Sequence, residues 1–122
     1  MAIVRYLVRN VDAAVSFYTA HLEFELERRM GPPFAIVRRG DLRLWLSGPE
    51  SSASRPMPDG RLPEPGGWNR LVIEVVDLQA TVQQLTQAGL IFRNQIVSGP
   101  GGKQILLEDP SGNPIELFQP AI

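Results

Sequence analysis

Apolar and polar positions follow the same order twice along the chain. An apolar segment at residues 3–8 leads to Asn10, and a second one at residues 69–76 leads to Asp77, 67 residues further on. Asn and Asp are favoured N-cap residues, so each predicts a helix that begins directly after it. Both predicted helices carry an apolar stripe at helical spacing, which indicates one face packed on a sheet. The stripes consist of Val11, Ala14, Val15, Tyr18 and Leu22, and of Leu78, Val82 and Leu85.

Three short strands are predicted after each helix, and segments rich in glycine and proline separate them. The predicted strands are residues 24–30, 34–38 and 42–46 in the first copy, and residues 91–97, 104–108 and 114–118 in the second. The order β-α-β-β-β therefore occurs twice. No G-x-G-x-x-G motif follows a strand and opens a helix, which argues against a dinucleotide-binding fold. The glycine-rich residues 98–103 lack the spacing of a phosphate loop and predict a hairpin turn.

The repeat predicts how the chain is organised. We expect a single α+β domain in which residues 1–47 and 68–122 form two βαβββ modules, joined by a proline-rich connector at residues 48–67. A module of this size cannot bury its sheet face alone. The two copies are therefore expected to pair and to enclose a cavity, which is the first place to look for a functional site.

Composition narrows the classes of function. The chain has 122 residues, a formal net charge of -1 and no cysteine. A net charge this close to zero does not indicate binding to nucleic acid or to an anionic membrane. The absence of cysteine excludes disulfides, thiolate catalysis and cysteine-ligated zinc, and suits the cytoplasm. With no apolar segment of membrane-spanning length, we expect a cytoplasmic protein without nucleic-acid or membrane partners.

Three stretches carry a resemblance to a known family. They are residues 10–18 with 22–24, residues 74–78 and residues 109–117. In this order and spacing the chain resembles the vicinal oxygen chelate superfamily, which includes glyoxalase I, bleomycin-resistance proteins, fosfomycin-resistance proteins and extradiol dioxygenases. The resemblance implies paired βαβββ modules whose curled mixed sheets surround an open cavity, usually in a homodimer.

Enzymes of this superfamily bind one divalent metal through four inward-facing positions. The resemblance places these positions at Ile3, Trp45, Arg70 and Glu116, and among them only Glu116 offers a metal-ligating atom. His21 falls at the end of the first predicted helix, away from the cavity. We therefore expect no metal and no cofactor, and Asp109 is assigned to a turn without a catalytic role. A metalloenzyme stays open if the strand register is misjudged, which would bring Glu74 or Glu64 into the site.

Strand alternation predicts the remaining cavity residues. Residues that are expected to face inward, or to flank the opening, combine arginine, glutamate and aromatic side chains. The candidate ligand-binding residues are Arg5, Arg43, Trp45, Trp68, Arg70, Glu116 and Phe118. Arg70 and Glu116 can contact the ligand, pair with each other in place of a metal, or do both. Trp68 is interpreted either as a flap over the cavity mouth or as a packing residue.

The sequence predicts a metal-independent small-molecule-binding protein of the glyoxalase/bleomycin-resistance type. Its ligand is expected to be a planar or anionic organic molecule, bound by apolar walls and a few charges. The alternative is a lyase or isomerase in which Glu116 or Glu74 is the general base, while Arg70 or Arg5 holds an oxyanion. A small organic ligand and a second copy of the chain are the expected partners.

Overall fold

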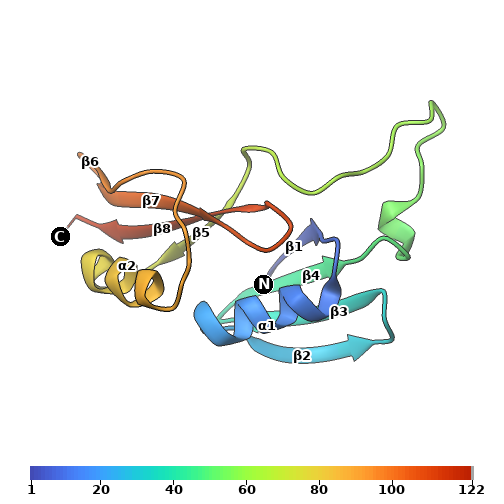
Figure 1. Cartoon of the computed structure of the whole chain (residues 1–122), viewed down its shortest axis with the longest axis horizontal. Coiled ribbons are helices and arrows are strands. Elements are labelled where there is room, and N and C mark those ends of the chain that lie inside the picture. The colour runs from blue at the N-terminus through green and yellow to red at the C-terminus, as the bar shows by residue number, and fades with distance from the viewer. Residues whose placement is uncertain (122) are drawn as a thin grey trace. The chain divides into compact units, whose positions relative to one another are not determined.

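Both predicted β-α-β-β-β copies form (Figure 1). The computed structural model describes residues 1–121. Its helices and strands, in chain order, are β1 (Ala2–Leu7), α1 (Val11–His21), β2 (Glu25–Met30), β3 (Phe34–Arg39), β4 (Leu42–Ser47), β5 (Leu71–Glu74), α2 (Leu78–Gln87), β6 (Val97–Gly99), β7 (Gly102–Glu108) and β8 (Pro114–Pro120), with a 3-10 turn at Ser52–Ser54. The predicted α+β fold with two βαβββ modules is confirmed.

Each copy builds its own four-stranded mixed sheet. The strand orders are β1-β4-β3-β2 and β5-β8-β7-β6, so the two sheets share one topology. In each of them the first strand runs parallel to the last, and the remaining neighbours are antiparallel. The chain forms two compact units. The first comprises Met1–Gly66 and Asp109–Asn113, and the second comprises Gly67–Glu108 and the residues from Pro114 onwards.

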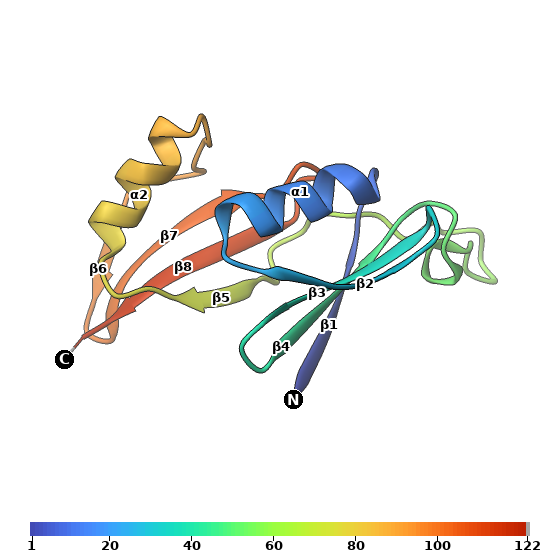
Figure 2. The ribbon, with the colours of Figure 1, turned by 90° about the horizontal axis from the view of Figure 1, so that it is seen from below.

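The first unit has a closely packed helix side. Asn10 caps α1 as predicted, because its Oδ1 accepts a hydrogen bond from the Ala13 backbone N–H at 2.9 Å. The helix lies along one face of the sheet (Figure 2), and its buried residues include Ala14 and Tyr18, both fully enclosed. Beneath it lie fully buried sheet residues, namely Ala35, Val37, Leu44 and Leu46. Of the apolar stripe predicted from helical spacing, Val11, Ala14, Tyr18 and Leu22 belong to this core, whereas Val15 is only half-buried.

A buried loop completes the first unit. Asp109 accepts a hydrogen bond from the Tyr18 hydroxyl at 2.8 Å, and Asn113 Nδ2 donates to Asp109 and to the Leu7 carbonyl. The backbone N–H groups of Ser111 and Asn113 also donate to Asp109. Burial, followed by the nearby Asp109 carboxylate, raises the pKa of Tyr18 well above its usual value. Asp109 therefore organises a turn, in agreement with the role that the sequence assigned to it.

The second unit is covered more sparsely by its helix. Asp77 caps α2 through the Ala80 backbone N–H at 3.1 Å, but only Leu78 and Leu85 of this helix are buried. The sheet residues on the helix side are apolar and buried, namely Leu71, Ile73, Ile105, Leu107, Ile115 and Leu117. Within residues 1–121 no helix is long and apolar enough to cross a membrane.

The strand predicted at residues 91–97 is wrong. Phe92 forms an isolated bridge with Leu107, and β6 begins only at Val97. Between these points the Asn94 side chain accepts the hydrogen bond of the Leu106 backbone N–H at 3.0 Å. A side-chain oxygen thus replaces a ladder carbonyl, so the following residues leave the sheet edge. The strand predicted at residues 69–76 forms over the shorter span of β5. The predicted hairpin turn at residues 98–103 is confirmed, because it joins β6 to β7.

Candidate ligand-binding faces of the two sheets

The face of the first sheet that points away from α1 carries an aromatic pocket. Trp45 lies opposite Arg5 on one side and opposite Ile36 on the other, so the three side chains share this face. The rings of Phe34 and Trp45 meet edge to face, with their centroids 5.6 Å apart. We call this space the first-unit pocket. Its volume is about 590 Å³, and it is lined by Arg5, Arg28, Met30, Pro33, Phe34, Ile36, Trp45, Glu50, Ser51 and Ser52.

Arg5 is held against the aromatic walls of this pocket. Its Nη1 donates to Ser47 Oγ at 3.0 Å, and Ser47 is fully buried. The guanidinium carbon lies 4.9 Å from the centroid of the Trp45 ring and 6.0 Å from that of Phe34, which is the geometry of a cation–π contact. Among the described residues 1–121, no carboxylate forms an ion pair with Arg5. The pocket thus presents a positive charge next to apolar ring surfaces.

Trp45 contributes an unusual polar group. Its Nε1 is buried and has no hydrogen-bond acceptor among the described residues. A buried donor without an acceptor costs free energy, and most such groups in folded proteins are paired. The fold of the first unit therefore buries the Trp45 indole N–H without supplying an acceptor for it.

Arg43, the third candidate in the first unit, is already paired. Its Nε lies 3.0 and 2.8 Å from the two carboxylate oxygens of Glu27. The hydrogen bond from Arg43 lowers the pKa of Glu27 below its ordinary value. Arg38 approaches the same carboxylate at 4.0 Å. Glu27 lies where the β2–β3 register shifts between Leu26 and Arg28, so strict alternation could not have placed it.

In the second unit, Arg70 and Glu116 form the predicted ion pair. The Arg70 Nε and Nη2 atoms donate to Glu116 Oε1 at 3.1 and 2.9 Å. The Glu116 side chain is 10% exposed and that of Arg70 is 28% exposed. Both donors engage the same oxygen, so Glu116 Oε2 accepts no hydrogen bond from residues 1–121. The pair fixes the carboxylate but leaves one of its oxygens available.

Trp68 lies beside a second arginine of this unit. The Arg93 guanidinium carbon lies 5.0 Å from the centroid of the Trp68 ring, and Arg93 Nε donates to Glu108 Oε2 at 2.7 Å. The indole is 72% exposed. The Trp68 backbone carbonyl also accepts a bond from Arg70 Nη1 at 3.4 Å. Trp68 is therefore a largely exposed aromatic side chain that contacts an ion-paired arginine. The sequence had singled out neither Arg93 nor Glu108.

Of the remaining candidates, Glu74 and Phe118 lie on the second sheet, whereas Glu64 and His21 belong to the first unit. Glu74 and Phe118 are opposite each other in the β5–β8 register, where Glu74 is exposed and Phe118 half-buried. Glu64 is exposed in the connector. His21 lies in the last turn of α1, with its ring centroid 5.8 Å from that of Phe17.

The donor set implied by the superfamily does not fit a divalent metal in this chain. Ile3 and Trp45 provide no lone pair, and Arg70 brings a permanent positive charge directly onto Glu116. Across residues 1–121, no three His, Asp or Glu side chains are grouped so that they could hold a metal ion.

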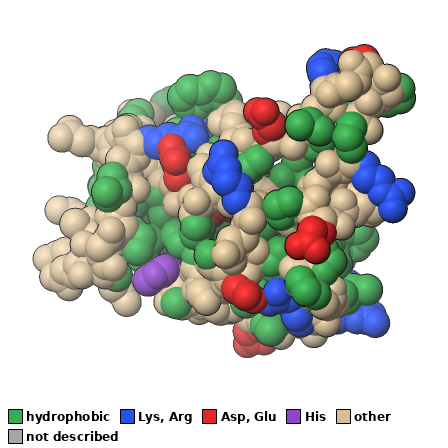
Figure 3. Space-filling model, turned by 45° about the vertical axis from the view of Figure 1, so that its right-hand side comes forward, with side chains coloured by type: hydrophobic (Ala, Val, Ile, Leu, Met, Phe, Trp, Pro, Cys, Tyr) green, Lys and Arg blue, Asp and Glu red, His purple; other side chains and the backbone are tan. Residues whose placement is uncertain are grey.

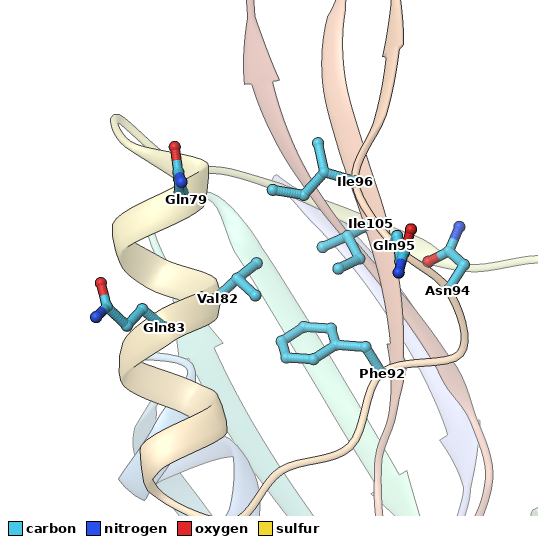
Figure 4. Close-up of a pocket in the computed structure, with 8 residues that line it drawn as sticks. All are labelled: Gln79, Val82, Gln83, Phe92, Asn94, Gln95, Ile96 and Ile105. Carbon is cyan, nitrogen blue, oxygen red and sulfur yellow. The ribbon is translucent and has the colours of Figure 1, made fainter.

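A second hollow lies on the helix side of the second sheet (Figure 4). Val82 of α2 and Phe92 point toward each other across the gap, and Ile96 and Ile105 lie beside them. The volume is about 660 Å³, and the full lining consists of Gln79, Val82, Gln83, Phe92, Asn94, Gln95, Ile96 and Ile105. This lining carries no ionisable side chain. The departure of residues 94–96 from the sheet edge, which the sequence did not predict, contributes three of these residues.

Charged side chains of both signs are interspersed on the surface. Figure 3 shows basic and acidic groups alternating with apolar ones on one face, without a large basic patch there. This agrees with the formal net charge of -1. This face lacks the concentrated positive potential that nucleic-acid backbones require.

Comparison with known proteins identifies the family. Residues 1–117 match the model of the Glyoxalase/Bleomycin resistance protein/Dioxygenase superfamily. The chain belongs to this superfamily. The resemblance drawn from the three sequence stretches is thereby confirmed. Among curated proteins, no sequence matches the chain significantly.

Several solved structures share the fold over nearly the whole chain. The lactoylglutathione lyase of Agrobacterium tumefaciens is 18% identical with a TM-score of 0.76, and the match covers 98% of this chain and 92% of that one. TnmS3, an antibiotic-binding protein from Streptomyces sp. CB03234, is 24% identical with a TM-score of 0.73, covering 98% and 93%. The bleomycin-binding protein of Streptomyces verticillus is 25% identical with a TM-score of 0.67, covering 98% and 95%.

Proposed function

We propose that this superfamily member binds a small organic ligand without a metal ion and sequesters it without chemical conversion. The observation that carries the proposal is the first-unit pocket, where Arg5 lies against Trp45 and Phe34 and pairs with no carboxylate of residues 1–121. Aromatic walls supply affinity for a planar molecule, and a few charges orient it. Two structural relatives are described as binding bleomycin and an antibiotic, which supports a binding role within this fold.

Metal independence is the part of the proposal that is easiest to test. The Arg70–Glu116 pair takes up the single carboxylate among the four positions that the superfamily uses for metal. Addition of nickel, zinc, manganese or ferrous ions to metal-free protein is expected to leave the melting temperature unchanged. A ligand that binds only the folded state raises stability by mass action, so specific binding would be visible as a saturable shift. Such a shift with one metal, absent in Glu116→Gln, would overturn metal independence.

An enzymatic role for Glu116 is the alternative that one observation favours. Glu116 Oε2 accepts no hydrogen bond within residues 1–121, while Arg70 holds the other oxygen. This arrangement suits a positioned general base. The two functions differ in what happens to the bound molecule. Recovery of a co-purifying ligand after prolonged incubation with fresh protein, followed by mass spectrometry, is expected to return it unchanged. Conversion that disappears in Glu116→Gln would establish the enzyme instead.

We also propose that the protein acts as a homodimer in the cytoplasm. Large apolar side chains remain exposed on the chain, including Val76 at 97% and Ile91 at 85%. Exposed apolar groups and open strand edges favour contact with a second copy. Size-exclusion chromatography with light scattering is expected to give twice the mass of one chain at micromolar concentration. A monomer under these conditions would contradict the proposed assembly.

A further inference from the structure

We propose that the first-unit pocket selects an aromatic anion, whose ring packs on Phe34 and Trp45 while Arg28 binds its acidic group. This inference rests on the proposed binding function and adds to it the class of ligand and the residue that selects it. The pocket offers the Arg28 guanidinium group, which forms no ion pair with the described residues 1–121, next to two aromatic walls.

The distribution of ion pairs in the first unit sets Arg28 apart. The other arginines of β2, β3 and β4 are matched with carboxylates: Arg29 with Asp12 at 2.6 Å, Arg38 and Arg43 with Glu27 at 4.0 and 2.8 Å, and Arg39 with Glu23 at 3.7 Å. Arg28 lies on the same strand as Arg29, yet its side chain makes no ion pair or hydrogen bond with residues 1–121. It lines the pocket instead.

The pocket lining is positively charged overall. It contains Arg5 and Arg28 and one acidic residue, Glu50, which pairs with neither of them. Opposite each other in the register, Arg28 of β2 and Ile36 of β3 both contribute to the lining, so the cation adjoins an apolar wall. A bound cation would meet two arginines, whereas a bound anion would find a free charge partner.

The two arginines have different roles in this arrangement. Arg5 is held by Ser47 and by the Trp45 ring, so it forms part of the wall. Arg28 keeps its full set of donors, and a guanidinium fork matches a carboxylate or sulfonate with two parallel hydrogen bonds. Apolar contacts with Phe34 and Trp45 then give affinity, and Arg28 gives the preference for negative charge.

Two fluorescent probes test this preference directly. 1-Anilinonaphthalene-8-sulfonate and N-phenyl-1-naphthylamine have the same ring skeleton and differ by one sulfonate group. Both are titrated into the full-length protein, and into Arg28→Met, Phe34→Leu and Arg55→Met. Arg55 is the matched control, because it also lacks an ion pair within the described chain but does not line the pocket. Circular dichroism verifies that each variant is folded.

We expect the sulfonate to bind the unaltered protein about tenfold more tightly than the neutral probe, as a charge-assisted bond to arginine predicts. Arg28→Met should remove this difference and preserve the affinity for the neutral probe. Phe34→Leu should weaken the binding of both probes. Arg55→Met should change the affinity for neither probe. Equal affinities in the unaltered protein, or a preference that survives Arg28→Met, would overturn the inference and leave the binding function standing. Binding unaffected by Phe34→Leu would exclude this pocket as the site. If neither probe binds saturably, the proposed function itself is overturned.

Discussion

The two units have the same strand order, yet charge is handled differently on the sheet faces that point away from their helices. In the first unit, Arg5 and Arg28 line a pocket and form no ion pair within residues 1–121, although Arg43 on the same sheet pairs with Glu27. In the second, Arg70 and Arg93 each meet a glutamate on the same sheet. The same topology therefore carries two arginines outside any ion pair of the described residues in one unit, and two ion-paired arginines in the other.

On the helix sides of the two sheets, the units differ in how closely the helix covers the sheet. α1 covers its sheet with fully buried residues, including Tyr18, whereas α2 leaves the hollow around Val82 and Phe92. Two units with the same order of elements can therefore differ in helix–sheet packing, because side-chain volume and local hydrogen bonds differ between them. The three predictions below test these contrasts, beginning with the helix sides.

Truncation of one apolar side chain in each unit should have very different effects. Leu44→Ala removes a fully buried side chain of the first unit and is expected to lower the free energy of unfolding by about 2–5 kcal/mol. Val82→Ala enlarges a hollow that is already open and should cost under about 1 kcal/mol. Urea unfolding followed by circular dichroism measures both. Equal losses would show that α2 packs as closely as α1.

The ion pair of the second unit should stabilise only while both partners are present. Arg70→Met leaves the Glu116 carboxylate largely buried and without its partner, and is expected to destabilise by about 2–4 kcal/mol. Glu116→Leu should destabilise less, because Arg70 is 28% exposed and can extend toward water. The double variant should lie within about 1 kcal/mol of the unaltered protein. Additive losses in a double-mutant cycle would contradict this coupling.

The smallest expected effect concerns Tyr18 and pH. The folded chain raises the pKa of Tyr18, so between the unfolded value of about 10 and the folded value the native state holds more protons. Stability should therefore fall as the pH rises above 10, and this part of the slope should be absent in Tyr18→Phe. At neutral pH the variant should lose about 1 kcal/mol through its missing hydrogen bond to Asp109. Tyr6 is present in both proteins, so its contribution to the pH dependence is the same in each. A pH-independent difference between them would contradict the shift.

Local signals in the sequence predicted a large part of this structure. Asn10 and Asp77 start the helices because an N-cap interaction spans only three residues. Arg70 and Glu116 could be paired because strand alternation puts them on one face. Glu27 escaped prediction since a register shift in β2 breaks that alternation. The strand predicted at residues 91–97 failed because the Asn94 side chain competes with the backbone for Leu106.

The aromatic pocket was predicted only in part. Arg5 and Trp45 were found by alternation, because both lie on strands whose opposite faces are clearly apolar. Arg28 was missed, because β2 is exposed along its whole length and gives no burial pattern from which to judge its faces. Phe34, the first residue of β3, was not singled out either. The Tyr18–Asp109 contact joins residues 91 positions apart, and no local pattern announces such a pairing.

The loop at Asp109–Asn113 has a consequence for how the protein is made. It belongs to the first unit, although it follows β7 and precedes β8 of the second. During synthesis, the Tyr18 side chain therefore emerges from the ribosome well before the acceptor for its buried hydroxyl, because Asp109 follows 91 residues later. A fragment that ends at the connector would carry the same defect permanently. The chain contains a repeat, but it cannot be cut into two self-sufficient halves.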